Sequence, residues 1–301
     1  MVWLTNTEYL AVVHRPKRLT LITVSGKIVA TYRFADPDSA QAGGLNFHGN
    51  LAADDEWKVY FIDEPGLRIF SFDVKTAPGN MRSSDLAVPR VFARLQSSGG
   101  SRSASTLSQF NESYNDNTLC NKMKFHGLAV GLTRRELYTE AGDSIVAFSL
   151  SDGSPRFRCI LESAHQFSSH VLGVIDRPNS VSYLIYSTSH GNVLHKKAFY
   201  RDGLLEEGST VIAHHGNDVN CVSDVRGVAT DQNGNLLLAD SKNGCIKVFS
   251  DNFHVVSTFG SGDPNSFNPS AVAVATLPSG QPVVCVAEFS LHKILYFSDT
   301  A

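Results

Sequence analysis

The chain has 301 residues, of which 42% are hydrophobic and 18% are charged, and its formal net charge is −3. This composition supplies a core for a folded domain, and the negative balance argues against a dedicated nucleic-acid binder, which usually carries a basic face. No run of about 18 apolar residues occurs, so the sequence contains no candidate membrane span. The five cysteines are odd in number, which argues against a disulfide framework, and they include no CxxC pair or other common zinc-binding spacing.

The beginning of the chain predicts short strands joined by tight turns. An apolar lead-in at Met1–Thr5 precedes Tyr9–Phe34, where Ser25-Gly26-Lys27 predicts a hairpin turn. No charged-then-apolar leader is present. The sequence opens inside this first unit, whose lead-in is cut short.

Units of the same kind recur, and the clearest is Asp224–Gly260. Four short runs of residues, either apolar or with apolar and polar residues in turn, are separated there by polar turns such as Asp231–Asn235. The runs and turns together leave no room for a helix. The six units are Met1–Phe34, Asn46–Asp73, Lys124–Leu150, Ser169–Phe199, Asp224–Gly260 and Asn268–Ser298.

The second apolar run of each unit ends at positions that repeat about every 50 residues, with one longer interval after Asp63. These positions are His14, Asp63, Glu140, Thr188, Asp240 and Glu288. The repeat predicts an all-β fold, a six-bladed β-propeller of four-stranded antiparallel blades that forms a single domain over residues 1–301. We expect Leu237, Ile246 and Val248 to pack between blades, and the seam blade to be three-stranded or completed by residues absent from this chain.

The long interval is explained by residues 79–121, which we expect to be a flexible inter-blade insertion. Ser97–Ser105 and Asn111–Asn117 are polar and carry too few apolar residues to bury themselves. The alternative is a lid or a partner-binding loop, since long loops in compact domains are often functional. Asn111-Glu-Ser113 is a glycosylation sequon, which matters only in a secreted protein.

The innermost strand of each propeller blade lines the central channel, so the first residues of these strands share one rim. The residues expected there are His48, His126, His170, Arg226 and Ser270. Three interpretations stand: hydrogen-bonded structural residues, a polar pocket for a small or anionic ligand anchored by Arg226, or a metal site if the imidazoles converge on one point. We predict that His48, His126, His170 and Arg226 form one polar ligand site at the channel mouth, with no bound metal.

Loops between the second and third strands open on the same face. Rim residues expected there are Arg15, Lys17, Arg18, Asp63, Glu140, His190, Asp240 and Glu288. The basic cluster at Arg15–Arg18 is either a solvated rim or a phosphate site. The recurring carboxylates are expected to accept hydrogen bonds from turn backbone, which is a structural role.

No motif of catalysis stands out, so no catalytic residue and no cofactor is predicted, and enzyme activity stays open. GxSxG, HExxH and a phosphate-binding loop are all absent. Calcium-dependent propeller hydrolases need Glu, Asn or Asp at the axis. This axis offers His, Arg and Ser instead.

Two families share motifs with the chain. Pro16, Lys17, Tyr32 and Phe34, followed by Val59–Lys75, match in register the corresponding segments of the yellow/major royal jelly family, and the likeness covers about residues 1–241. The stretch 224–298 resembles NHL-repeat propellers, most clearly in GVATDQNGNLLLAD.

The two resemblances imply different functions and locations. The yellow/major royal jelly resemblance implies an extracellular protein that binds a small ligand, such as an aromatic amine or a catechol-type compound, at the channel mouth. The NHL resemblance implies a cytoplasmic recognition domain that binds a protein or single-stranded RNA, as in tripartite-motif ubiquitin ligases. The sequence alone does not choose between them.

Overall fold

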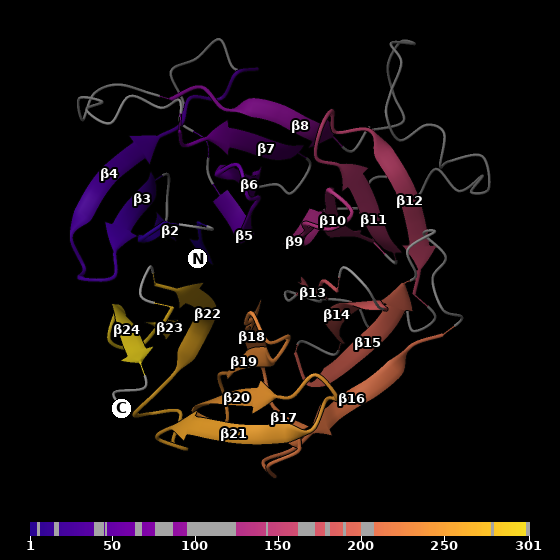
Figure 1. The fold of residues 1–301 in the computed structure, drawn as a ribbon, viewed down its shortest axis with the longest axis vertical. Coiled ribbons are helices and arrows are strands. Elements are labelled where there is room, and N and C mark those ends of the chain that lie inside the picture. The colour runs from indigo at the N-terminus through magenta and orange to yellow at the C-terminus, as the bar shows by residue number, and fades with distance from the viewer. Residues whose placement is uncertain are drawn as a thin grey trace.

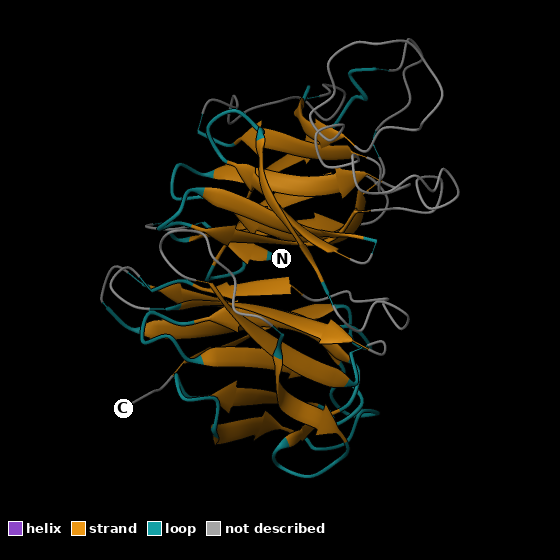
Figure 2. Ribbon diagram, turned by 90° about the vertical axis from the view of Figure 1, so that its right-hand side faces the viewer, coloured by secondary structure: helices purple, strands orange, loops and turns teal. Residues whose placement is uncertain are grey.

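The computed structural model is a ring of six β-sheets around a central axis, and Figure 1 looks along that axis. The residues that it describes are 1–4, 7–14, 18–38, 45, 47–63, 68–75, 87–94, 125–142, 144–161, 172–177, 181–188, 191–199, 208–277 and 280–298. Throughout these ranges the regular structure is β-strand, as Figure 2 shows from the side, and the described part of the chain holds no helix that could cross a membrane. The six-bladed all-β propeller predicted from the repeat is therefore confirmed.

The first three blades each have four antiparallel strands. Blade one consists of β1 (Val2–Trp3), β2 (Tyr9–His14), β3 (Arg18–Thr23) and β4 (Ile28–Arg33). Blade two consists of β5 (Phe47–Ala53), β6 (Lys58–Asp63), β7 (Arg68–Asp73) and β8 (Arg90–Arg94). Blade three consists of β9 (Phe125–Gly131), β10 (Glu136–Ala141), β11 (Ser144–Ser149) and β12 (Pro155–Ile160).

The last three blades differ in strand number. Blade four has five strands: β13 (Leu172–Ile175), β14 (Ser182–Thr188), β15 (Val193–Phe199), β16 (Thr210–His215) and β17 (Cys221–Val222). Blade five has four: β18 (Val225–Thr230), β19 (Leu236–Asp240), β20 (Cys245–Phe249) and β21 (Val255–Gly260). Blade six has three in the described residues: β22 (Pro269–Thr276), β23 (Pro282–Glu288) and β24 (Lys293–Ser298).

The periodic positions fall at the ends of the second strands. His14, Asp63, Thr188, Asp240 and Glu288 each end such a strand, and Glu140 is the penultimate residue of β10. The repeat of about 50 residues therefore predicted the position of every blade, because the second strand of each blade ends at the same rim.

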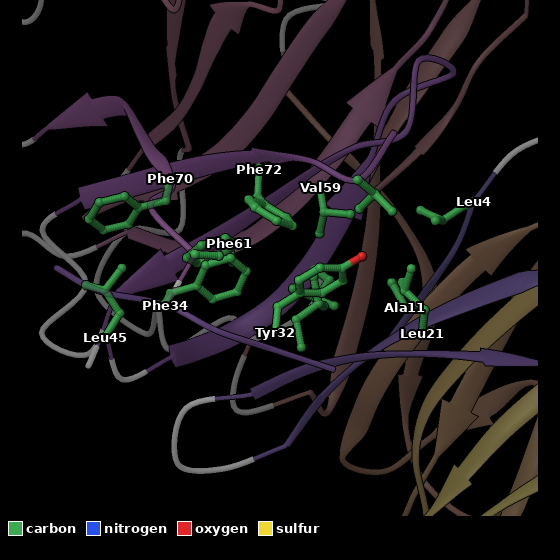
Figure 3. Close-up of a cluster of buried hydrophobic side chains, with 14 residues drawn as sticks. Leu4, Ala11, Leu21, Tyr32, Phe34, Leu45, Val59, Phe61, Phe70 and Phe72 are labelled. Carbon is green, nitrogen blue, oxygen red and sulfur yellow. The ribbon is translucent and has the colours of Figure 1, made fainter. Parts of the chain in front are cut away.

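The core lies in the spaces between blades. Between blades one and two it is aromatic: the ring of Phe34 lies 5.0 Å from that of Phe61 and 4.8 Å from that of Phe72 (Figure 3). Between blades five and six, Leu237, Ile246 and Val248 pack in one cluster, as their alternation predicted. Each blade thus buries one face against each neighbour, which is why its central strands are apolar on both sides.

Two features depart from six identical blades. β8 lies within the stretch 79–121, where an insertion was expected, and forms the outer strand of blade two; of that stretch only 87–94 is described. β17 pairs parallel to β16 and adds a fifth strand to blade four. A two-residue strand after a polar turn carries too little periodicity to be seen in the sequence.

Candidate functional site

The inner strands form a closed ring, in which β1, β5, β9, β13, β18 and β22 each lie beside the next and β22 lies beside β1. The residues that start these strands therefore share one rim, the channel mouth. Four strands carry a register irregularity near this end: between His48 and Ala52 in β5, between Val225 and Gly227 in β18, between Pro269 and Ala271 in β22, and opposite Thr139 and Glu140 in β9. Bulges of this kind re-aim side chains at a rim.

Arg226 occupies the irregular position in β18, and its neighbour Gly227 brings two blades together. A Cβ on Gly227 would lie 2.8 Å from the Cα of Ala271, so the backbones of β18 and β22 touch at this level. Arg226 and Ser270 each precede one of these contact residues. The structure therefore places them on neighbouring strands at the channel mouth.

Arg226 is paired yet reachable from solvent. Its Nη2 donates to Oδ2 of Asp224 at 2.8 Å and its Nε donates to the same oxygen at 3.1 Å, while the side chain stays partly exposed. Asp224 has a positive φ of 61°, an uncommon conformation for a residue other than glycine. The guanidinium is thus oriented at the rim with donors remaining for a ligand.

The other four predicted ligand residues are placed as follows. His126 lies in β9, where it is the register partner of Glu140, and is partly exposed. Ser270 donates from its hydroxyl to the carbonyl of Ala287 at 3.1 Å, a bond within its own blade. His170 and the side chain of His48 lie outside the described residues.

Among the predicted rim residues, the carboxylates of Asp63, Asp240 and Glu288 accept backbone hydrogen bonds, as their position predicted. Asp63 accepts from the Arg68 amide at 2.9 Å, and Asp240 accepts from the Ser223 amide at 2.9 Å. Although burial acts to raise the pKa of Glu288, the amides of Asn268, Leu291 and Ser290 hold it below its usual value. Glu140 is buried in β10 and Arg18 begins β3 with an exposed side chain; Arg15, Lys17 and His190 lie outside the described residues.

A chain of hydrogen bonds connects the rim of blade five with that of blade six. The Ser241 amide donates to the Asp224 carbonyl at 3.2 Å, and its hydroxyl bonds the side-chain oxygen of Asn268 at 2.5 Å. The Phe289 amide then donates to the Asn268 carbonyl at 2.9 Å. Arg226, bonded to Asp224, is thereby held in one framework with Phe289.

Sequence reasoning did not single out Phe289 and Leu291, which this framework presents to solvent. Phe289 is 58% exposed and Leu291 is 53% exposed, both in the β23–β24 loop at the channel mouth. The sequence did contain an indication of this exposure: Phe289 and Leu291 are apolar residues in the turn FSLH, which is not part of an alternating strand pattern. Arg226, Phe289 and Leu291 are hereafter called the blade five–six rim.

The channel itself contains a cavity of about 190 Å³. Its walls come from all six inner strands and are mostly small or apolar, among them Trp3, Ala53, Val130, Val174, Ala229 and Val274. The lining begins at Leu128, Val228 and Val272, two residues beyond His126, Arg226 and Ser270. His126, Arg226 and Ser270 therefore lie at the mouth beyond this cavity and do not line it.

The chemistry available at the mouth is recognition through hydrogen bonds, charge and apolar contact. In the described part of the chain, no group of three or more His, Cys, Asp or Glu residues is arranged to hold a metal ion. Of the cysteines, Cys245 and Cys285 are buried, and burial raises the pKa of the Cys285 thiol to about 12.

Comparison with known proteins follows this geometry. Residues 223–249 match the NHL repeat. The matched stretch covers β18, β19 and β20 and includes Asp224 and Arg226. A search of curated protein sequences gives no match.

Solved structures share the propeller fold. A structural genomics protein of unknown function from Bacteroides thetaiotaomicron has a TM-score of 0.65 at 16% identity, with 97% of this chain covered; the chain spans only 66% of that protein. The structure of streptogramin B lyase has a TM-score of 0.57 at 12% identity, and the alignment covers 99% of this chain and 82% of the lyase chain. A chain of the nidogen/laminin complex has a TM-score of 0.56 at 11% identity, and the alignment covers 96% of this chain and 93% of that chain. At these identities the likeness shows the fold alone.

Proposed function

We propose that the protein is a recognition propeller that binds a partner protein at its channel mouth, through the blade five–six rim. The observation that carries this proposal is the exposure of Phe289 and Leu291 at the same channel mouth as the oriented guanidinium of Arg226. Aromatic and arginine side chains dominate the energetically important positions of protein interfaces. The NHL match over the same blade supports a binding function.

Rigidity of the rim adds to the argument. Asp224, Ser241 and Asn268 bond to one another and to the loops that carry Arg226 and Phe289. A rim that is already ordered loses little conformational entropy on binding. On the opposite face, Leu132 is an exposed large apolar residue of the β9–β10 turn and provides a control position.

Site-specific photo-crosslinking tests the proposal. A photoreactive amino acid at Leu291 is expected to trap a discrete protein in cells that express the chain, whereas the same group at Leu132 is not. Arg226→Ala and Phe289→Ala should each weaken the adduct at position 291, and ribonuclease should leave it intact. Equal adducts from both faces, or no adduct at position 291, would contradict the proposal. A ribonuclease-sensitive adduct would favour RNA as the partner.

A second candidate is a small ligand at the same mouth, as the likeness to the yellow/major royal jelly family implies. One observation favours it: the cavity of about 190 Å³ lies directly beyond the mouth. An apolar cavity of roughly 150 Å³ is large enough to bind benzene, so the ring of an aromatic amine or a catechol fits, with its polar groups toward His126 and Arg226. Dopamine and catechol added to the purified protein should raise its melting temperature. Ala229→Leu, which fills the cavity, should abolish that rise while leaving the crosslink at Leu291 unchanged.

A further inference from the structure

The dipeptide Asn-Gly occurs twice in the sequence, and both copies lie in blade five. Asn233-Gly234 is in the turn between β18 and β19, and Asn243-Gly244 is in the turn between β19 and β20. The backbone is alike at the two sites. Each glycine amide donates to the carbonyl three residues before it, at 3.1 Å and 3.2 Å, and the two glycines have positive φ values of 79° and 60°. A difference in behaviour between the two sites therefore comes from their surroundings.

Asn-Gly is the reactive form of an asparagine peptide bond because glycine has no side chain to hinder attack by its nitrogen. After hydroxide removes the proton from the glycine amide, the nitrogen attacks Cγ of the asparagine. The new N–Cγ bond displaces the side-chain nitrogen as ammonia and leaves a succinimide ring. Water then opens the ring at one of its two carbonyls and gives aspartate or isoaspartate, in which the main chain runs through the side-chain carbon. Water is the sole co-reactant, and no electrons are transferred.

The surroundings of Asn233 leave this reaction free to occur. Its side chain is exposed, and among the described residues none forms a hydrogen bond with its carboxamide. Its backbone amide donates to Oδ1 of Asp231 at 2.9 Å, a bond that orders the turn and does not involve the side chain. Apart from chain neighbours, a Cβ on Gly234 would have no atom within 4 Å. The Cγ of Asn233 and the nitrogen of Gly234 can therefore approach one another.

Asn243 is held in place by contrast. Its Nδ2 donates to Oδ2 of Asp240 at 2.8 Å and to the carbonyl of Gly216 at 2.9 Å. Gly244 lies against backbone, since a Cβ there would be 2.6 Å from the carbonyl carbon of Asp263. The nitrogen that must leave as ammonia is the atom that both hydrogen bonds hold. Reaction at Asn243 therefore requires these contacts to break first.

We propose that Asn233 is a site of spontaneous deamidation and that Asn243 is protected from it. The product adds a negative charge beside Asp231, whose carboxylate accepts from the amides of Asn233 and Asn235. Isoaspartate also adds one atom to the main chain, which disturbs the bond from the Asp231 amide to the Asn235 carbonyl at 3.0 Å that closes the turn. This turn lies at the end of blade five away from the channel mouth, so the inference is independent of the proposed function.

The test follows the two sites in purified protein kept at about pH 8 in water enriched in heavy oxygen. Peptide mapping by mass spectrometry should show deamidation about tenfold faster at Asn233 than at Asn243, because a hydrogen bond to a carboxylate must first break at the second site. In the chain unfolded by urea the two rates should be similar, since the dipeptides are the same. Uptake of one heavy oxygen at Asn233 identifies water as the reactant.

Matched variants test the site through its charge and its effect on the turn. On native isoelectric focusing, incubated protein should gain an acidic form that Asn233→Gln abolishes, because the longer side chain must close a larger ring. Asn252→Gln should retain the acidic form, since Asn252 is also exposed but precedes the bulky Phe253. Incubated protein should melt at a lower temperature than Asn233→Asp, which has the charge without the added main-chain atom.

Equal rates at Asn233 and Asn243 in the folded protein would overturn the proposal, because the structure would then give no protection. An acidic form that persists in Asn233→Gln would place the modification elsewhere and would also overturn it. A melting temperature equal to that of Asn233→Asp would overturn the predicted effect of isoaspartate on the turn.

Discussion

The ammonium of Lys247 lies 3.3 Å from Oδ2 of Asp240, and both side chains are buried in blade five. Lys247 also donates to the carbonyls of Asp218 and Cys221, and Asp240 accepts from the Ser223 amide. The pair therefore fastens the loop around β17 to the rim of blade five, directly beneath Asp224. Burial raises the pKa of Asp240 even with these hydrogen bonds in place.

Replacing Lys247 should expose how much this pair contributes. Lys247→Met leaves the Asp240 carboxylate buried without its cation, and breaking a buried pair in this way typically costs about 3–5 kcal/mol. We expect a loss of that size in the free energy of unfolding at pH 7, measured by urea denaturation. A loss below about 1 kcal/mol would mean that the ion pair contributes little to the stability of the fold.

The pH dependence of the same variant has a definite sign. A carboxyl whose folded-state pKa is raised holds its proton to higher pH in the native state, so the free energy of unfolding falls as pH rises between the two pKa values. Removing Lys247 raises the pKa of Asp240 further. The deficit of Lys247→Met relative to the original protein should therefore shrink on acidification toward the unfolded-state pKa of about 4. The double variant Lys247→Met, Asp240→Asn should recover part of the deficit at pH 7 and show less dependence on pH.

Arg68 forms the other dense charge network, at the rim between blades one and two. Its Nε donates to Asp63 at 2.7 Å, and Nη1 and Nη2 donate to Asp36 at 2.8 Å. Arg68→Ala should lower the free energy of unfolding by about 1.5–3 kcal/mol, the range for hydrogen bonds to charged groups. Arg94→Ala is the matched control, because Arg94 and Asp38 form a solvent-exposed pair that should contribute less than about 1 kcal/mol.

The Arg68 network also predicts acid sensitivity. The hydrogen bond from Arg68 holds the pKa of Asp36 below its ordinary value. A depressed folded-state pKa gives stability that is present above the unfolded-state value and lost as pH falls through the folded-state value. The original protein should thus lose stability below about pH 4 more steeply than Arg68→Ala does. Parallel curves for the two proteins would contradict this assignment.

Gly227 should resist substitution because backbone, not side chain, surrounds it. A Cβ there would lie 2.8 Å from the Cα of Ala271 and 2.9 Å from the amide nitrogen of Val272. Gly227→Ala should lower the free energy of unfolding by about 1–3 kcal/mol through overpacking. At Gly173 the nearest atom is a methyl carbon of Val228 at 2.9 Å, which can move, so Gly173→Ala should cost less. Equal losses at the two sites would show that β18 and β22 separate easily.

The cysteines should differ in reactivity. Burial raises the pKa of Cys245 to about 11 and that of Cys285 to about 12, so few of these thiols are ionised at pH 8. Cys221, which is partly exposed, should react with iodoacetamide first, and Cys159, Cys245 and Cys285 should react only after denaturation. Peptide mapping by mass spectrometry measures this order. Early labelling of Cys285 would indicate that blade six opens locally.

Sequence reasoning succeeded for the fold because the blade is a local unit. Most neighbouring strands within a blade are joined by short turns, so alternation and turn residues such as Asp231–Asn235 indicate most of the strand pairing within a stretch of consecutive residues. Asp63, Asp240 and Glu288 marked the ends of second strands in the sequence. Their carboxylates accept hydrogen bonds from backbone amides that are close in sequence or one strand away. The parallel strand β17 was missed, because two residues carry no period.

The amino-acid sequence by itself determined the propeller and the number of blades, and it placed His48, His126, Arg226 and Ser270 close to the starts of four inner strands. Only the tertiary structure decided what those residues do: that Arg226 pairs with Asp224, that Ser270 bonds within its blade, and that the cavity begins beyond both. It also revealed the exposure of Phe289 and Leu291, and with it the surface proposed for binding a partner protein. The physical reason is the separation along the chain of the residues that interact. Strand pairing and turns depend on neighbours along the chain, whereas exposure and side-chain partners depend on closure of the ring, which brings blade six against blade one, more than 250 residues away.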